Sequence, residues 1–258
     1  MRVIDTDQLE RDGFVILRGL VRDEEIAEFE SSITRFSEAQ LEKLGLPRRA
    51  AEPFIDLFTR GGQYTKRIYK LLEELFVLHR MSVRIGEELR TAGFLDWAKI
   101  DVPLIWPDIR ADIPNDTVRS FPVHQDIAST QCGKAWRMWV ALRPANAVAG
   151  SMALYPGTHN NGLVPHNMDQ PLRPFVEPQH YAGIAPVVLD LPAGDGVLMN
   201  PLVLHSSVLN QSERTKFTLM IQVQDYALVL DPEDERGPLA ELVRFGAKLT
   251  RARATAAG

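Results

Sequence analysis

Short apolar segments separated by turn signals fill the chain after about residue 98, and this pattern limits the possible folds more than any other feature of the sequence. Pro156-Gly157, Asn161-Gly162 and the glycine-containing stretch 193–196 mark the turns. Most segments between such turns are shorter than a typical helix and suit the strands of an antiparallel barrel or sandwich. We expect strands at 138–142, 152–155, 186–191, 196–199 and 215–226.

The first third of the chain has a helical pattern that follows one short strand, expected at 13–17. Asp23 is typical of a helix N-cap, and acidic residues follow it in the first turn, where the helix dipole favours them. Apolar residues then recur every three or four positions, as on one face of an amphipathic helix. A second helix is expected over 66–90 and a further one over 238–250.

No segment resembles a linker, so we expect one domain over residues 1–258, with a helical first third packed on a core from about 98 to 226 and a C-terminal helix. The formal net charge is −5 without a basic block, so nucleic acid is not an expected partner. The single cysteine excludes an internal disulfide and a cysteine-based zinc cluster. Because neither a signal peptide nor a long apolar span is evident, we expect a cytoplasmic protein without membrane association. The sequence leaves the oligomeric state open.

The triplet His124-Gln125-Asp126 is the most informative local motif. In an extended strand, His124 and Asp126 point to the same face, whereas Gln125 points away unless the strand ends there. His205 follows the apolar segment 196–199 and is a candidate third ligand. A histidine, one residue and an aspartate occur together often by chance, and the alternative is a histidine at a strand end that bonds to a nearby carboxylate.

Two histidines and one carboxylate on one face of a metal ion form the facial triad of non-haem ferrous oxygenases, which leaves three coordination positions open. These nitrogen and oxygen ligands suit Fe(II), although zinc is chemically possible with the same set. His124, Asp126 and His205 are therefore predicted to be both the metal ligands and the centre of catalysis.

The segment 215–226 alternates between apolar and polar residues, as expected for a strand that packs a core on one face and lines a polar cavity on the other. Lys216 lies on the polar face, and Arg214 has the same parity. A buried cation is costly to desolvate without an anion, and a dicarboxylate cosubstrate on the metal would supply one. The alternative is that Lys216 reaches solvent at the end of the strand.

In their order and spacing, five segments resemble the phytanoyl-CoA dioxygenase family, iron- and 2-oxoglutarate-dependent oxygenases with a double-stranded β-helix core. The resemblance covers most of the chain and implies a mainly β fold with flanking helices on this jelly-roll, cupin-like core. The segments are residues 9–20 with the acidic helix start at 23–29, the metal motif at 124–126, Trp139-Val140-Ala141-Leu142, the stretch 150–159 and Gly194-Asp195-Gly196 before His205.

The resemblance also implies roles for individual residues. His124, Asp126 and His205 would hold Fe(II), and O₂ would be the co-reactant. Lys216, eleven positions after His205, corresponds to the residue that binds 2-oxoglutarate, although most family members have arginine there. The remaining cofactor-binding candidates are Arg214 as a substitute cation, Ser207 as a hydroxyl donor and Trp139 as an aromatic wall.

Substrate contacts are expected near the metal motif, from Gln125 and from the upstream residues Trp106, Arg110 and Arg119, for which packed or solvated roles are the alternative. The expected reaction is oxidation of an unactivated C–H bond of a small organic molecule, usually hydroxylation, with release of succinate and CO₂. Desaturation, ring formation and epimerisation need only a different fate of the same radical. Two other hypotheses remain: a jelly-roll metal enzyme that does not use 2-oxoglutarate, in which Lys216 binds the substrate, and a catalytically silent small-molecule binding protein.

Overall fold

The structure is a computed structural model that describes residues 2–126, 134–167 and 174–225. The helix expected over 238–250 lies outside the described residues. Within them, no helix combines the length and apolar character needed to cross a bilayer.

Helices precede most of the strands along the chain. The helices are α1 (Thr6–Asp12), α2 (Asp23–Lys43), α3 (Pro53–Arg60), η1 (Gly62–Tyr64), α4 (Thr65–Glu73), α5 (Phe76–Thr91), α6 (Phe94–Trp97), η3 (Thr158–Asn161) and η4 (Pro178–His180). The strands are β1 (Phe14–Leu17), β2 (Pro103–Asp112), β3 (Ala135–Ala141), β4 (Ser151–Leu154), β5 (His166–Asn167), β6 (Phe175–Val176), β7 (Val187–Val188), β8 (Gly196–Met199), β9 (His205–Val208) and β10 (Lys216–Asp225).

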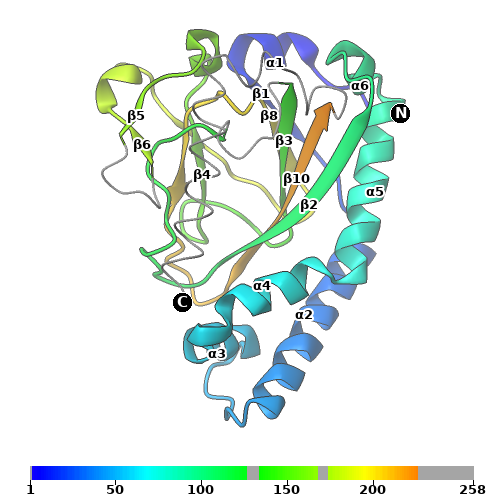
Figure 1. Cartoon of the computed structure of the whole chain (residues 1–258), viewed down its shortest axis with the longest axis vertical. Helices are drawn as coiled ribbons and strands as arrows, with labels where there is room; N and C mark the ends of the chain where they lie inside the picture. Colours follow the sequence, from blue (N-terminus) through cyan, green and yellow to red (C-terminus); the bar gives the residue numbers. More distant parts are fainter. Residues whose placement is uncertain (1, 127–133, 168–173, 226–258) are drawn as a thin grey trace.

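Two antiparallel sheets form the core (Figure 1). The larger sheet has the strand order β1-β8-β3-β10-β2, and the smaller one has the order β7-β4-β9. Apolar side chains of both sheets, including Trp139 and Met199 from the larger and Leu154 from the smaller, pack together between them. This arrangement confirms the predicted jelly-roll class with flanking helices. The strand expected at 196–199 has the bounds of β8, whereas the one expected at 186–191 is reduced to the short β7.

The strand β10, which lies between β3 and β2, alternates as predicted. Phe217 and Leu219 face outward into the cluster beneath the helices, where the Phe217 ring lies edge-on to Phe29 of α2 at 5.3 Å and to Phe54 of α3 at 4.9 Å. Met220 faces inward and packs against the second cluster, between the sheets. The outer face of the larger sheet is therefore closed by helices, and its inner face is left to line the interior.

The helix expected over 66–90 is two helices, α4 and α5, with a break at Glu74 and Leu75. Leu75 has an extended backbone, with ψ of 120°, and no glycine or proline marks the break in the sequence. Both helices contact β2, and the break lets each of them bury its own apolar stripe against that strand. Tertiary packing sets the break, which is why helical periodicity alone did not predict it.

Asp23 is the first residue of α2 rather than its N-cap. Arg22 takes the cap position with an extended backbone, and its N–H donates to the Glu25 carboxylate at 3.1 Å. The prediction of an Asp23 cap was therefore wrong, because the buried Glu25 satisfies the helix start from the third position of the helix.

Glu25 also ties α2 to α5. Its carboxylate accepts hydrogen bonds from Arg84 Nε at 3.1 Å and Nη2 at 2.7 Å, and only 3% of its side chain is exposed. Burial alone would raise the pKa of Glu25, but hydrogen bonds from Arg22 and Arg84 outweigh it and lower the pKa to about 2.

We expect Glu25→Gln to lower the free energy of unfolding at pH 7 by about 3 kcal/mol, since it leaves a charged arginine without its buried partner. The carboxylate pKa is lower in the folded chain, so its stabilisation is complete above pH 4.5 and disappears as the pH falls towards 2. Urea unfolding of both proteins across this range measures the difference. The exposed neighbour Glu24 provides the control variant, Glu24→Gln. A loss of unfolding free energy in Glu25→Gln that does not depend on pH would contradict the role of the Glu25 charge.

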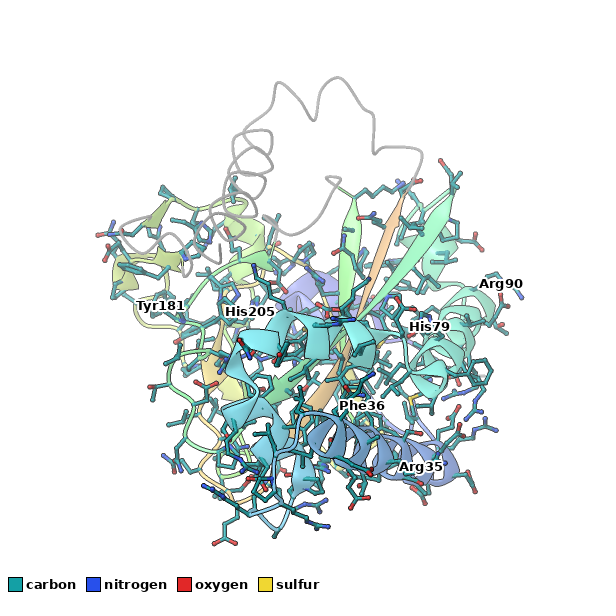
Figure 2. All side chains as sticks on the ribbon, turned by 60° about the horizontal axis from the view of Figure 1, so that its bottom comes forward. Arg35, Phe36, His79, Arg90, Tyr181 and His205 are labelled. Carbon is teal, nitrogen blue, oxygen red and sulfur yellow. The ribbon has the colours of Figure 1, made fainter. Side chains whose placement is uncertain are left out.

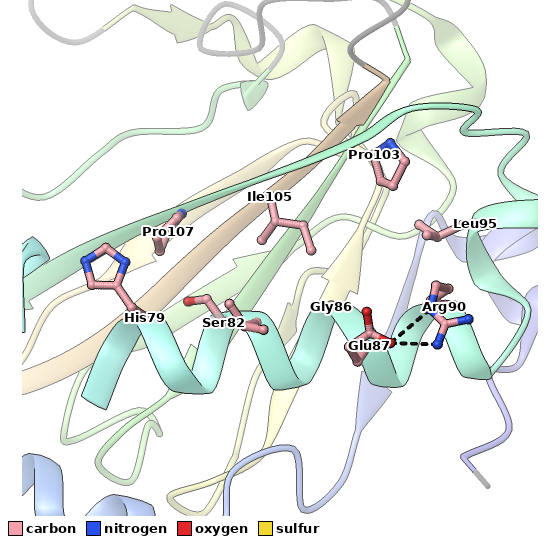
Figure 3. A pocket seen from close by; sticks show the side chains of 10 residues that line it. His79, Ser82, Gly86, Glu87, Arg90, Leu95, Pro103, Ile105 and Pro107 are labelled. Carbon is pink, nitrogen blue, oxygen red and sulfur yellow. Dashed lines mark hydrogen bonds and ion pairs between the residues drawn. The ribbon is translucent and has the colours of Figure 1, made fainter. Parts of the chain in front are cut away.

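A shallow pocket lies between α5 and β2, on the outer side of the larger sheet (Figure 3). Its lining includes His79 and Gly86 from the helix and Ile105 and Pro107 from the strand. A Cβ atom at Gly86 would lie 2.1 Å from Cδ1 of Ile105, so a glycine permits this close approach of the helix to the strand. The pocket belongs to the packing of the helix and is remote from the predicted metal ligands, none of which lines it.

Candidate metal centre

His124, Asp126 and His205 meet in the interior, with ligand atoms that all lie within 4.8 Å of one another. Asp126 Oδ1 is 3.6 Å from His124 Nε2, and Asp126 Oδ2 is 3.7 Å from His205 Nε2. Figure 2 shows His205 inside the fold, whereas Arg35 of α2 and Arg90 of α5 lie on its outer helices. The structure thus brings together three residues that the sequence singled out and that are far apart along the chain.

Backbone pairing sets this meeting. His205 begins β9, and His124 pairs with it as an isolated antiparallel bridge, with N–H···O distances of 2.9 and 3.0 Å. The Asp126 N–H donates to the Pro201 carbonyl at 2.9 Å, which fixes the carboxylate beside both rings. The parity argument assumed that the metal motif is a strand of the sheet. It is instead a short segment held by three backbone hydrogen bonds, two with His205 and one with Pro201.

Backbone carbonyls also set the tautomer of both imidazoles. Nδ1 of His124 lies 2.8 Å from the Pro122 carbonyl, and Nδ1 of His205 lies 2.9 Å from the Val203 carbonyl. Since a carbonyl only accepts hydrogen bonds, each Nδ1 carries a proton, and the neutral form of each ring has its lone pair on Nε2. This leaves both Nε2 atoms available as metal ligands, oriented as imidazole ligands usually are.

The charges at the site favour a metal-binding state. Burial and the neighbouring His124 lower the pKa of His205 to about 4, although Asp126 opposes the shift, so this imidazole is neutral at pH 7. Burial would raise the pKa of Asp126, but Arg137 and the two histidines outweigh it and hold the pKa below its usual range. Arg137 Nε lies 3.6 Å from Asp126 Oδ2. Neutral nitrogens and one carboxylate are the donor set that ferrous iron accepts.

The Gln125 side chain is held by hydrogen bonds within the fold. Its Nε2 donates to the carbonyls of Gly162 at 2.9 Å and Leu202 at 2.7 Å, and its Oε1 accepts from the Val164 N–H at 3.1 Å. The side chain is buried, with 3% exposed, and its hydrogen-bonding groups serve the fold. The segment ends at Asp126 and turns Gln125 into the loops that surround it, and the substrate contact expected of Gln125 stays a prediction.

We expect Gln125→Ala to lower the free energy of unfolding by about 2–3 kcal/mol, because it leaves buried backbone groups without partners. Metal affinity is also expected to fall, since the variant loosens the segment that carries two ligands. Thermal unfolding with and without metal measures both effects. Gln63→Ala, at an exposed site, is the matched control. Unchanged metal affinity in a destabilised Gln125 variant would limit the residue to a folding role.

Lys216 lies on the inner face, as the alternation predicted, and is buried with 4% exposed. Its Nζ lies 2.7 Å from Asp112 Oδ2 and 4.9 Å from the centroid of the Trp139 ring. Burial lowers the pKa of Lys216, and Asp112 partly opposes the shift. Asp112 therefore supplies an anion for this cation from within the chain. The sequence analysis had expected the anion to come from a cosubstrate.

Arg214 lies outside the interior. Its side chain is 68% exposed, and its Nη2 lies 3.6 Å from Glu30 Oε2 of α2. The expectation that Arg214 shares the inward face of Lys216 is wrong, because β10 begins only at Lys216 and the preceding residues turn along the surface.

The remaining predicted residues divide between the surface and the interior. Arg119 pairs with Asp116, and its guanidinium carbon lies 4.5 Å from the centroid of the Phe58 ring; its substrate contact stays a prediction. Trp106 lies in β2, and its side chain is outside what the structure describes. Ser207 accepts a hydrogen bond from the N–H of Phe121 at 3.0 Å and keeps its own hydroxyl proton to donate.

Sequence reasoning missed three features near the site. Arg137 and Asp112 carry interior charges, and the Gln125 N–H donates to His166 Nε2 at 3.1 Å. Polar residues at every second position of β2 could have identified that strand, but Pro103 and Pro107 disguise it. The prolines are tolerated because β2 is an edge strand of its sheet.

The fold and the ligand set together define a jelly-roll protein with a candidate facial triad of two histidines and one carboxylate. The chain belongs to the phytanoyl-CoA dioxygenase (PhyH) family, whose sequence model matches residues 9–218. It is 25% identical over 236 residues to the peroxisomal phytanoyl-CoA dioxygenase of Bos taurus, an alignment that covers 79% of this chain. The chain spans 63% of the length of that relative.

Solved structures with the same fold include EvdO2 from Micromonospora carbonacea var. aurantiaca complexed with 2-oxoglutarate. The TM-score is 0.59 with 18% identity, and the match covers 92% of this chain and 94% of that one. The epimerase SnoN in complex with Fe³⁺, alpha-ketoglutarate and nogalamycin RO has a TM-score of 0.50 with 18% identity, over 85% of this chain and 81% of that one. At these identities the likeness establishes the fold.

Proposed function

We propose that the protein is an Fe(II)- and 2-oxoglutarate-dependent oxygenase that oxidises an unactivated C–H bond of a small organic molecule. The observation that carries the proposal is the convergence of the ligand atoms of His124, Asp126 and His205 within 4.8 Å, with each imidazole Nδ1 against a backbone carbonyl and each Nε2 near the carboxylate. Family membership supports it independently. Hydroxylation is the proposed outcome.

The residues present fit ferrous iron by their donor chemistry. His124 and His205 would supply neutral nitrogens and Asp126 one carboxylate oxygen, and Arg137 beside Asp126 keeps that carboxyl group ionised. When bound, iron with 2-oxoglutarate and O₂ supplies the oxidant for the C–H bond, with release of succinate and CO₂. The protein's own part is to hold the ligands, place the substrate and keep the interior dry.

The cosubstrate end of the site lies along β10 and β3. Lys216 would bind the far carboxylate of 2-oxoglutarate, and Ser207 has a hydroxyl proton left to donate to it. Trp139, beneath the Lys216 ammonium, would form an aromatic wall. Apolar side chains behind Trp139, among them Val197 and Met199, exclude water from this part of the interior. The absence of water strengthens the electrostatic interactions between the charged groups in this part of the interior.

Anaerobic spectroscopy tests the proposal directly. Protein with Fe(II) and 2-oxoglutarate is expected to show a weak metal-to-ligand charge-transfer band in the visible range, and admission of O₂ is expected to yield succinate. Iron bound without such a band or succinate would favour the jelly-roll enzyme that does not use 2-oxoglutarate. Iron and 2-oxoglutarate bound without oxidation of any small molecule would favour the silent binding protein.

A further inference from the structure

Three charged side chains form one buried cluster on the inner face of the larger sheet. Asp112 stands between two cations: its Oδ2 lies 2.7 Å from Lys216 Nζ, and its Oδ1 accepts from Arg110 Nε at 2.7 Å. Asp112 lies opposite Lys216 in the pairing of β2 with β10, and Arg110 lies two residues away on the same face. The strand register therefore builds the cluster.

The cluster carries one positive charge more than it neutralises. Lys216 and Arg110 contribute two cations and Asp112 one anion, and the cations together outweigh burial and hold the pKa of Asp112 below its usual range. Two further carboxyl groups lie nearby: Asp126, which has Arg137 as an ion-pair partner, and Asp108, two residues before Arg110 on the same face of β2, whose pKa is raised mainly by burial. The excess charge therefore refers to Arg110, Asp112 and Lys216 alone. A single buried excess charge is costly unless an anion joins it. One carboxylate from a ligand would complete the balance.

Arg110 also lies towards the metal site. Its guanidinium carbon lies 5.1 Å from the centroid of the Phe121 ring, and that ring lies 5.3 Å from the His124 ring. Its Nη2 donates to the Arg119 carbonyl at 2.7 Å, which fixes the plane of the guanidinium. Beyond the bonds to Asp112 and to this carbonyl, guanidinium has further N–H groups that can serve a ligand.

We propose that Arg110, Asp112 and Lys216 form a single subsite for the far carboxylate of the cosubstrate, and that Arg110 supplies the positive charge that this carboxylate meets. The inference rests on the proposed function. Asp112 already neutralises one cation, so Lys216 alone would offer a subsite without net charge. The second cation supplies the net charge that Lys216 and Asp112 together lack, and Arg110 lies on β2, outside the strand that carries Lys216.

Removal of charges within the cluster tests the proposal. The probes are 2-oxoglutarate and 2-oxobutanoate, which has the same keto acid but no far carboxylate, and each dissociation constant is measured by anaerobic titration of the visible band. We expect Arg110→Gln to weaken 2-oxoglutarate binding at least about tenfold and to leave 2-oxobutanoate unchanged. The double variant Arg110→Gln/Asp112→Asn restores the single excess charge and is expected to recover most of the affinity.

The control is Arg35→Gln, since that guanidinium lies exposed on α2, outside the cluster. Thermal unfolding reports whether each variant is folded, and Arg110→Lys, which keeps the charge, is a second variant that should retain partial affinity. Equal weakening of both ligands by Arg110→Gln, or no recovery in the double variant, would overturn the subsite. Failure of the unsubstituted protein to bind 2-oxoglutarate would instead overturn the proposed function, and this inference with it.

Discussion

His205→Ala abolishes the binding of ferrous iron at micromolar concentrations and, with it, all succinate formation; this is the largest effect that we expect from any single substitution. The variant leaves only His124 and Asp126 as ligands. Loss of a group that merely orients a ligand costs about 10–100-fold in metal affinity, so loss of the ligand itself is expected to exceed that range. Metal analysis after gel filtration and the visible band with 2-oxoglutarate measure the effect.

His79→Ala is the matched control for this experiment. His79 lies on α5, about half exposed, and lines only the outer pocket (Figure 3). The control variant is expected to bind iron like the unsubstituted protein. Retention of iron by His205→Ala with unchanged affinity would refute the ligand assignment, whatever its effect on turnover.

Lys216→Met is expected to weaken 2-oxoglutarate binding by about 10–100-fold while iron binding stays intact, since hydrogen bonds to charged groups contribute about 1.5–3 kcal/mol. Methionine keeps much of the side-chain volume beside Trp139 and removes only the cation. Arg110 and Asp112 then neutralise each other, and the ligand carboxylate meets no net charge. Titration of iron first and of 2-oxoglutarate second separates the two affinities.

An exposed lysine in the last turn of α2 provides the control, Lys43→Met, which should change neither affinity. If Lys216→Met binds 2-oxoglutarate as tightly as the unsubstituted protein, the lysine is a structural partner of Asp112 or a substrate contact. The second of these outcomes is the one expected for a jelly-roll metal enzyme that does not use 2-oxoglutarate.

Local patterns identified much of the fold and the centre of the site. The alternation over 215–226 predicted both the outer packing of Phe217 and the burial of Lys216, because neighbouring residues of a strand face opposite sides of the sheet. The residue types of His124, Asp126 and His205 were enough to suggest a metal ligand set. These features depend on the order of residues within one segment, or on chemistry that few side chains share.

Local patterns failed where a partner from elsewhere in the chain decides the outcome. Gln125 binds the loops around it, since carbonyls from two distant segments accept its amide protons. Arg214 lies outside the interior because β10 starts two residues later, and its side chain lies close to Glu30 of α2. Neither the partners nor the start of pairing can be read from the few residues around these positions.

The sequence by itself determined which residues could bind a metal, which face of β10 is apolar and that the later part of the chain forms short strands. Only the tertiary structure decided that Asp112 joins Lys216 to Arg110 and that the backbones of His124 and His205 pair. The physical reason is the distance along the chain over which each feature is determined. Side-chain chemistry and strand parity are properties of adjacent residues, whereas the register between β2 and β10 determines which charges share one buried volume.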